Sequence, residues 1–254
     1  GSAIPMAASR WMRPRRCTTT HSLGTGGHGR DAAACGMLAG VHPITYLFVP
    51  GNRPERFDKA FASGADAVII DLEDAVADAH KALARANVAE WFAQSPLRER
   101  TLVRVNAAGS KAFADDVRML AGAPPLVAML AKADRAEDVR QLAVTLKDGS
   151  GVVALIESAR GIANVNEIAA AHRVTRLAFG ALDYAADLGL SGDVRGLIHP
   201  SAAVALGSRL SKLPLPFAAP PVSLDDEDMI AEDVRFAQAL GFGAKLCIHP
   251  RQVP

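Results

Sequence analysis

The chain has 254 residues, half of them apolar, and its 28 basic and 27 acidic side chains leave a net charge of +1. This composition is that of a folded globular protein, and it excludes disorder along the whole chain. So small a net charge gives nucleic acid no electrostatic reason to bind, and no apolar run reaches the roughly 18 residues of a membrane span. The three cysteines form no CxxC pair, which argues against a disulfide framework or a zinc knuckle and favours a cytoplasmic protein.

The N-terminal segment differs in composition from the rest of the chain. Residues 1–40 carry five arginines against one acid, Asp31, and are rich in Gly, Ser, Thr and Ala without apolar periodicity. We therefore expect residues 1–43 to form a disordered or irregular extension. An arginine-rich, acid-poor start is also typical of mitochondrial transit peptides, and on that reading the protein would reside in the mitochondrial matrix.

Short apolar runs alternate with segments of helical spacing from residue 44 onward. Most of the runs are apolar on both faces, as in parallel strands covered by helices, and they span 45–50, 66–71, 101–106, 126–131, 152–156, 175–180, 215–222 and 244–249. Segments with helical spacing lie between them at 53–63, 78–94, 110–121, 134–147, 161–172 and 226–240. The alternation predicts an α/β fold, a (β/α)8 or TIM barrel rather than a doubly wound sheet, with residues 44–254 as one catalytic domain.

Polar or charged residues stand at or just beyond the C-terminal ends of six of these strands. They are Asp71, Glu73, Asp74, Arg104, Asn106, Lys132, Glu157, Asp183 and His249. In a barrel of parallel strands all C-terminal ends meet on one face, where enzymes of this fold have their active sites. We therefore expect these groups to line one pocket.

The acids in this set predict a metal site. Glu157 and Asp183, with Asp71, Glu73 and Asp74 further round the barrel, would repel one another in a shared pocket unless a cation lay among them. Oxygen ligands indicate a hard divalent ion. Mg²⁺ is expected because it takes one or two protein carboxylates and leaves its other positions to water and substrate.

Three further features each allow more than one interpretation. Arg104, inside the apolar run LVRVN, either pairs with a barrel carboxylate or clamps a substrate carboxylate or enolate oxygen. Lys132 is either a solvated or salt-bridged lysine or a Schiff-base lysine, and a metal centre favours the former. The loop 50–54 opens a helix and exposes backbone N–H groups and Arg53 to an anion, and Pro50 and Gly51 at its start are candidate substrate contacts.

Six segments together resemble a known family. They are YLFVPGNRPERFDKA (46–60), DAVIIDLEDAV (66–76), VRVN (103–106), ALIESARG (154–161), FGALDYAADLG (179–189) and KLCIHPRQV (245–253). In this order and spacing the chain resembles the citrate lyase beta-subunit-like group of the HpcH/HpaI aldolase family. The resemblance implies a TIM barrel, dependence on Mg²⁺, assembly into homotrimers or hexamers, and chemistry on acyl-CoA.

The resemblance also assigns roles to individual positions. Glu157 and Asp183 match the family's metal ligands, Arg104 matches an arginine that contacts substrate oxygen, and Glu73 and Asp74 match acids beside the metal. Asp71 would orient its neighbours. The backbone N–H groups of Gly180, Ala181, Leu182 and Asp183 would hold a keto-acid carboxylate, and Arg53 and Lys59 would lie near the phosphates of CoA.

The implied activity is a Mg²⁺-dependent carbon–carbon lyase. It would cleave, or form, a 3-hydroxyacyl thioester such as citryl-, malyl- or citramalyl-CoA, giving a 2-keto acid and an acyl-CoA. The alternatives are a pyruvate-type aldolase on free hydroxy acids, a malyl-CoA thioesterase and a non-catalytic barrel subunit. Relatives continue beyond the last matched segment into a C-terminal lid, so we expect a barrel domain without that lid.

Overall fold

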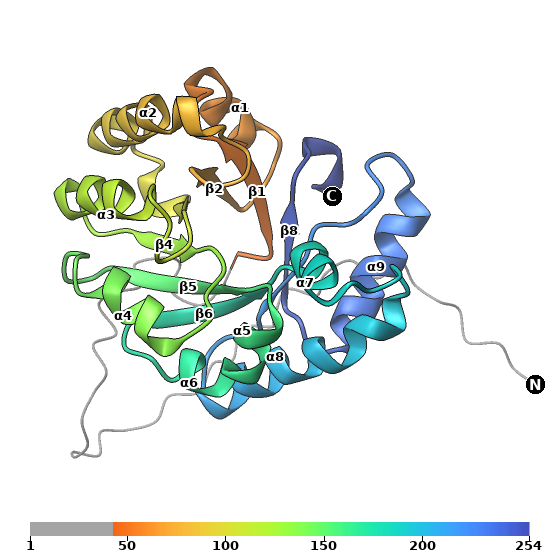
Figure 1. Ribbon diagram of the computed structural model, residues 1–254. Coiled ribbons are helices and arrows are strands. Elements are labelled where there is room, and N and C mark those ends of the chain that lie inside the picture. The colour runs from red at the N-terminus through yellow and green to blue at the C-terminus, as the bar shows by residue number, and fades with distance from the viewer. Residues whose placement is uncertain (1–42, 254) are drawn as a thin grey trace, which may run out of the picture.

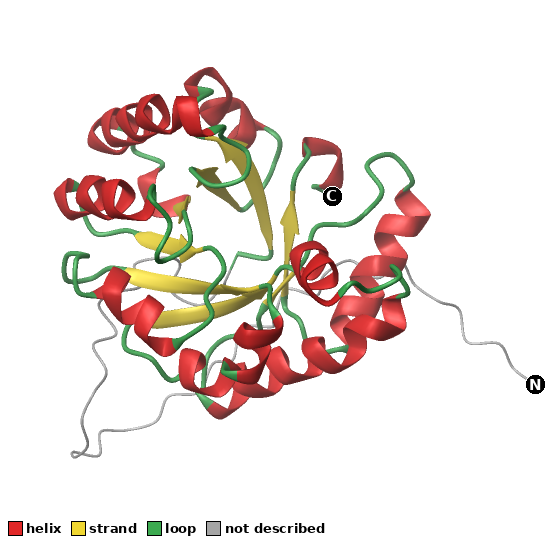
Figure 2. Cartoon of the chain, viewed as in Figure 1, coloured by secondary structure: helices red, strands yellow, loops and turns green. Residues whose placement is uncertain are grey.

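The computed structural model describes residues 43–253, which form a closed barrel of parallel strands with helices around it (Figures 1 and 2). The strands pair in chain order, and the last closes onto the first. They are β1 (Thr45–Pro50), β2 (Ala67–Asp71), β3 (Thr101–Val105), β4 (Val127–Leu130), β5 (Gly151–Ile156), β6 (Val174–Phe179), β7 (Phe217–Ala218) and β8 (Ala244–Cys247). The predicted TIM barrel is confirmed, and the predicted extension falls, apart from Pro43, outside the described residues.

The helices lie outside the ring of strands, as Figure 2 shows. They are α1 (Phe57–Ala62), α2 (Lys81–Gln94), α3 (Phe113–Gly122), α4 (Ala136–Ala143), α5 (Ala159–Ala163), α6 (Val165–Ala169), α7 (Ala181–Leu188), α8 (Ile198–Leu210) and α9 (Glu227–Ala239). Short 3-10 turns precede several of them, among them η2 (Pro54–Arg56) before α1. Within residues 43–253 no helix is both long and apolar enough to cross a membrane.

Two features of the predicted element pattern are wrong, and two helices add to it. The predicted strand 215–222 shortens to β7, because its three prolines lack the N–H groups that a strand ladder needs. The predicted helix 161–172 is two helices, α5 and α6, divided at Asn164, whose backbone is not helical. Finally, α7 and α8 lie outside the predicted helical segments.

Inward and outward side chains alternate along the strands, and this alternation places the site. The inward side chains below the C-terminal face are apolar: Tyr46, Ala67, Ile69, Leu102, Val127, Met129, Val153, Leu155, Ala178, Phe217, Ala244 and Leu246. Six residues lie two positions after members of this layer, toward the C-terminal ends of the strands: Phe48, Asp71, Arg104, Glu157, Gly180 and Ile248. A strand has a side-chain period of two, so the polar groups among these residues face the barrel mouth above the apolar layer.

Candidate active site

A cavity of about 310 Å³ opens at the C-terminal ends of the strands. Its charged lining residues are Asp71, Asp74, Arg104, Glu157 and Asp183, all of them predicted from the sequence. The other four residues expected in this pocket lie outside its lining: Glu73, Asn106, Lys132 and His249. Apart from its charged residues, the wall is formed by apolar residues and one glycine. The barrel thus brings residues from β2, β3, the end of β5 and α7 into one site, as the convergence of strand ends predicts.

Arg104 is the cation of this cavity. Its Nε and one terminal nitrogen each donate to a different carboxylate oxygen of Asp71 at 2.6 Å, and its other terminal nitrogen lies 3.0 Å from Glu73. Asp71 is fully buried and lies directly opposite Arg104 in the β2–β3 register. The guanidinium also lies 4.8 Å from the centre of the Phe48 ring. Burial would lower the pKa of Arg104, but its contacts with Asp71 raise that pKa above the ordinary value, so the side chain stays charged.

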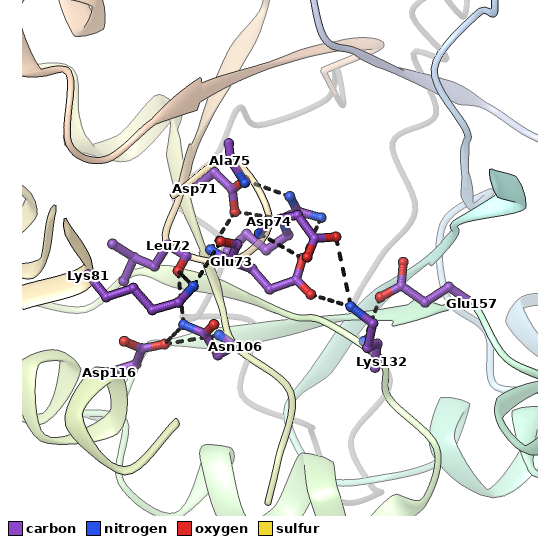
Figure 3. A network of polar contacts seen from close by, with 11 residues as sticks. Asp71, Leu72, Glu73, Asp74, Ala75, Lys81, Asn106, Asp116, Lys132 and Glu157 are labelled. Carbon is purple, nitrogen blue, oxygen red and sulfur yellow. Dashed lines mark hydrogen bonds and ion pairs between the residues drawn. The ribbon is translucent and has the colours of Figure 1, made fainter. Parts of the chain in front are cut away.

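The two predicted acids Glu73 and Asp74 have different surroundings. Glu73 is 5% exposed, and its carboxylate is paired with both Arg104 and the ammonium of Lys132. Burial raises the pKa of Glu73, against the opposing effect of these two cations. The side chain of Asp74 is more than half exposed, lines the cavity and lies 3.8 Å from the Lys132 ammonium. Of the two, Asp74 is therefore the acid that a substrate can reach (Figure 3).

The loop that carries these acids is fixed by hydrogen bonds at its backbone. The Asp71 carboxylate accepts the N–H groups of Glu73 at 2.9 Å and Ala75 at 3.0 Å. The buried ammonium of Lys81 donates to the carbonyl oxygens of Leu72 and Glu73, each at 2.9 Å, as Figure 3 shows. Sequence reasoning did not identify Lys81, because nothing in its helical surroundings marks it as a loop contact.

Lys132 connects two of the site carboxylates. Its ammonium pairs with Glu73, and its backbone N–H donates to a carboxylate oxygen of Glu157 at 2.7 Å. The residue adopts a left-handed backbone conformation, with φ of 49°, which costs energy for a residue other than glycine. The salt-bridge interpretation of Lys132 is confirmed.

Glu157 and Asp183 form an acidic pair on one side of the cavity. Glu157 follows β5 and is 3% exposed, and Asp183 lies in the first turn of α7. Burial, and after it repulsion from Asp183 and Glu73, raises the pKa of Glu157 to about 8. In residues 43–253 no group of three or more His, Cys, Asp or Glu residues is arranged to hold a metal. Two carboxylates are nevertheless the donor set that Mg²⁺ ordinarily takes from a protein, and a dication would relieve their repulsion, so the residues fit this ion.

The N-terminus of α7 offers backbone donors beside this pair. Gly180 is not one of them, because its N–H donates to the Ile156 carbonyl oxygen at 2.9 Å, and this part of the predicted contact set is wrong. The N–H groups of Ala181, Leu182 and Asp183 belong to the first turn, where an α-helix offers them no acceptor of its own. These three residues line the cavity, so their N–H groups and the helix dipole favour an anion there.

A contact outside the cavity ties α7 to α5, the helix that begins two residues after Glu157. The Asp187 carboxylate accepts the backbone N–H of Ala159 at 2.8 Å. Asp187 stands one helical turn after Asp183, and Ala159 stands two residues after Glu157. This bond therefore helps set the separation of the two acids. No local sequence signal predicts it, because its two partners are 28 residues apart.

The predicted contacts in the loop after β1 divide into two groups. Pro50 lines the cavity, whereas Gly51 does not. A Cβ on Gly51 would lie 2.9 Å from the Asp71 carbonyl oxygen and 3.0 Å from the Leu72 side chain, so this glycine allows close packing instead of binding substrate. Arg53 and Lys59 are exposed and lie outside the cavity lining, and their contact with CoA stays a prediction.

Comparison with known proteins places this barrel and its site in a family. The family model of HpcH/HpaI aldolase/citrate lyase matches residues 45–250. The chain belongs to this family. A citrate lyase subunit beta-like protein of Mycobacterium tuberculosis is 40% identical over 220 residues, which cover 82% of this chain and 76% of the relative.

The names of two further relatives state a substrate or a bound ligand. An L-malyl-CoA/beta-methylmalyl-CoA lyase of Cereibacter sphaeroides is 33% identical over 240 residues, covering 82% of this chain and 75% of the lyase. A citrate lyase beta subunit from Mycobacterium tuberculosis, solved with oxaloacetate and magnesium, superposes with a TM-score of 0.75 at 37% identity. That alignment covers 84% of this chain and 94% of the other.

Proposed function

We propose that this protein is a Mg²⁺-dependent carbon–carbon lyase of 3-hydroxyacyl-CoA thioesters such as citryl-, malyl- or citramalyl-CoA, with a 2-keto acid and an acyl-CoA as products. One observation carries the proposal: a single cavity holds the acidic pair Glu157 and Asp183, the fixed cation Arg104 and the free N–H groups of α7. This set provides a site for a metal, for an oxyanion and for a carboxylate. The enzyme class agrees with that of the malyl-CoA lyase relative.

Each of these residues has a separate role in cleavage. The free N–H groups of Ala181 to Asp183 hold the carboxylate next to the reacting carbon. Asp74 accepts the proton of the substrate hydroxyl, the carbon–carbon bond breaks, and the hydroxyl oxygen becomes the keto oxygen. The electron pair of the broken bond passes to the thioester, and Arg104 stabilises the enolate oxygen until its carbon takes up a proton. When bound at Glu157 and Asp183, Mg²⁺ supplies Lewis-acid stabilisation of the reacting oxygen.

The ribose and phosphate groups of CoA must lie outside a cavity of this size. We propose that Arg53, just before η2, and Lys59, on α1, receive the phosphates, since both are exposed cations. The double variant Arg53→Ala/Lys59→Ala should bind acetyl-CoA more weakly and pyruvate unchanged. Unchanged acetyl-CoA binding would place the phosphates elsewhere.

Ligand binding by isothermal titration calorimetry tests the site. Pyruvate should bind wild-type protein with Mg²⁺ and not in EDTA, and Glu157→Gln should lose this binding. Glu167→Gln is the matched control, because Glu167 is exposed on α6 and does not line the cavity. Pyruvate binding that needs no metal would contradict the proposal and favour a Schiff-base or non-catalytic function.

We further propose that the protein assembles into homotrimers or hexamers. Three large apolar side chains, Ile198, Leu206 and Leu210, are exposed on a single helix, α8. Apolar surface concentrated in this way is typical of an interface between proteins. Light scattering should give three or six times the chain mass, and a monomer would contradict this proposal.

A further inference from the structure

The chemistry of the cavity wall constrains the keto acid that it receives. We propose that the substrate is the thioester of a 3-hydroxy acid whose cleavage releases a 2-keto acid with a single carboxylate and a small uncharged substituent, such as pyruvate or 2-oxobutanoate. This inference rests on the proposed function and selects among its substrates. It excludes oxaloacetate, and therefore citryl-CoA, as the preferred substrate.

The first observation is the charge of the lining. Among residues 43–253 the cavity is lined by four carboxylate side chains, Asp71, Asp74, Glu157 and Asp183, and by one cation, Arg104. A dication at the acidic pair leaves this lining with a net negative charge. A second carboxylate on the substrate would therefore be repelled unless a further cation met it.

The second observation is that the lining cation is already engaged. Arg104 gives two of its five N–H groups to Asp71 and a third to Glu73, and the proposed reaction uses the other two for the enolate oxygen of the thioester. Lys132, which lies nearby outside the cavity lining, pairs with Glu73 and Asp74. The free N–H groups at the start of α7 provide a place for one carboxylate, the one beside the keto group. Within the described residues the lining offers no second such place.

The third observation is the apolar character of the remaining wall. Phe48, Leu155, Leu246 and Ile248 face the cavity from β1, β5 and β8, and Ala219 and Pro220 complete this side after β7. Among the described residues that form the wall there is no Ser, Thr, Asn, Gln or His. A methyl or ethyl group gains from burial against such a wall, by about four-fold in affinity per carbon. A carboxylate in the same position loses its water without gaining a partner.

Calorimetry with three keto acids on the Mg²⁺-loaded protein tests this selection. Pyruvate and 2-oxobutanoate should bind at least about ten-fold more tightly than freshly dissolved oxaloacetate, because the second carboxylate stays unpaired. Oxaloacetate is the informative competitor because a relative has been solved with it. Oxaloacetate binding as tight as that of pyruvate would overturn the inference and leave the proposed lyase intact. If no keto acid binds in the presence of Mg²⁺, both this inference and the proposed lyase function are wrong.

A gain-of-function variant tests whether the charge of the lining is what weakens oxaloacetate binding. Ile248→Arg places a cation on the apolar wall, and the native side chain is 56% exposed, so the arginine has room. This variant should bind oxaloacetate about ten-fold more tightly and pyruvate no better. Leu182→Arg is the second variant, since Leu182 also lines the cavity and is 66% exposed. Val144→Arg, on an exposed site outside the lining, is the control. Failure of both cavity variants, when folded, to improve oxaloacetate binding would overturn the inference.

Discussion

Competition between a proton and the metal gives a quantitative test of the acidic pair. In the metal-free protein, burial and then repulsion from Asp183 raise the pKa of Glu157 to about 8, so this side chain holds a proton at neutral pH. A divalent cation must displace that proton, because only the ionised carboxylate coordinates. With a pKa of about 8, the apparent metal affinity should rise about 25-fold between about pH 6.5 and about pH 8.5, and then level off.

Mn²⁺ is a suitable probe, since it accepts the same oxygen ligands as Mg²⁺ and its free ion is counted by electron paramagnetic resonance. Added Mg²⁺ should displace it. Glu157→Gln should bind Mn²⁺ weakly and without pH dependence in this range, whereas Glu167→Gln should behave as wild type. A wild-type affinity that stays constant with pH would refute the placement of a protonated Glu157 at the metal site.

Three substitutions test the framework around the cavity. Asp187→Ala removes the acceptor that ties α7 to α5, and Mg²⁺ affinity should fall about ten-fold in calorimetry while the melting temperature stays unchanged. Arg104→Lys keeps the charge but loses the bidentate contact with Asp71. It should lower the free energy of unfolding, measured in urea, by about 3 kcal/mol. Gly51→Ala should cost about 1–3 kcal/mol in the same titration, because its Cβ would crowd the Asp71 carbonyl oxygen.

Each of these results has an outcome that contradicts its reasoning. Full Mg²⁺ affinity in Asp187→Ala would mean that α7 needs no such tether. Wild-type stability in Arg104→Lys would mean that the guanidinium geometry contributes nothing to the pair. The control for Gly51→Ala is Gly122→Ala, where a Cβ meets nothing within 4 Å, and equal stabilities of the two variants would contradict the packing role.

The barrel and most of the cavity lining are predictable from the sequence for one physical reason. Parallel strands all end on the same face, so polar residues after successive apolar runs must converge, and Arg104 and Glu157 do so. The short β7 could have been predicted as well, since prolines cannot complete a strand ladder.

The finer roles depend on partners that local sequence does not encode. The N–H of Gly180 is engaged by the β5–β6 ladder, and that depends on the register of two strands. Glu73 and Asp74 are adjacent acids in one loop, and the sequence does not distinguish them. In the fold, Glu73 pairs with Arg104, whereas Asp74 lines the cavity. Asp187 and Ala159 meet because α7 packs beside α5, which no periodicity shows.

Product analysis of one reaction tests the central claim most directly. Citramalyl-CoA, incubated with the protein and Mg²⁺, should yield pyruvate and acetyl-CoA in equal amounts by liquid chromatography and mass spectrometry. EDTA or the substitution Asp183→Asn should abolish both products. Release of free CoA with intact citramalate would identify a thioesterase instead, and unchanged citramalyl-CoA and malyl-CoA in the presence of Mg²⁺ would contradict the lyase assignment.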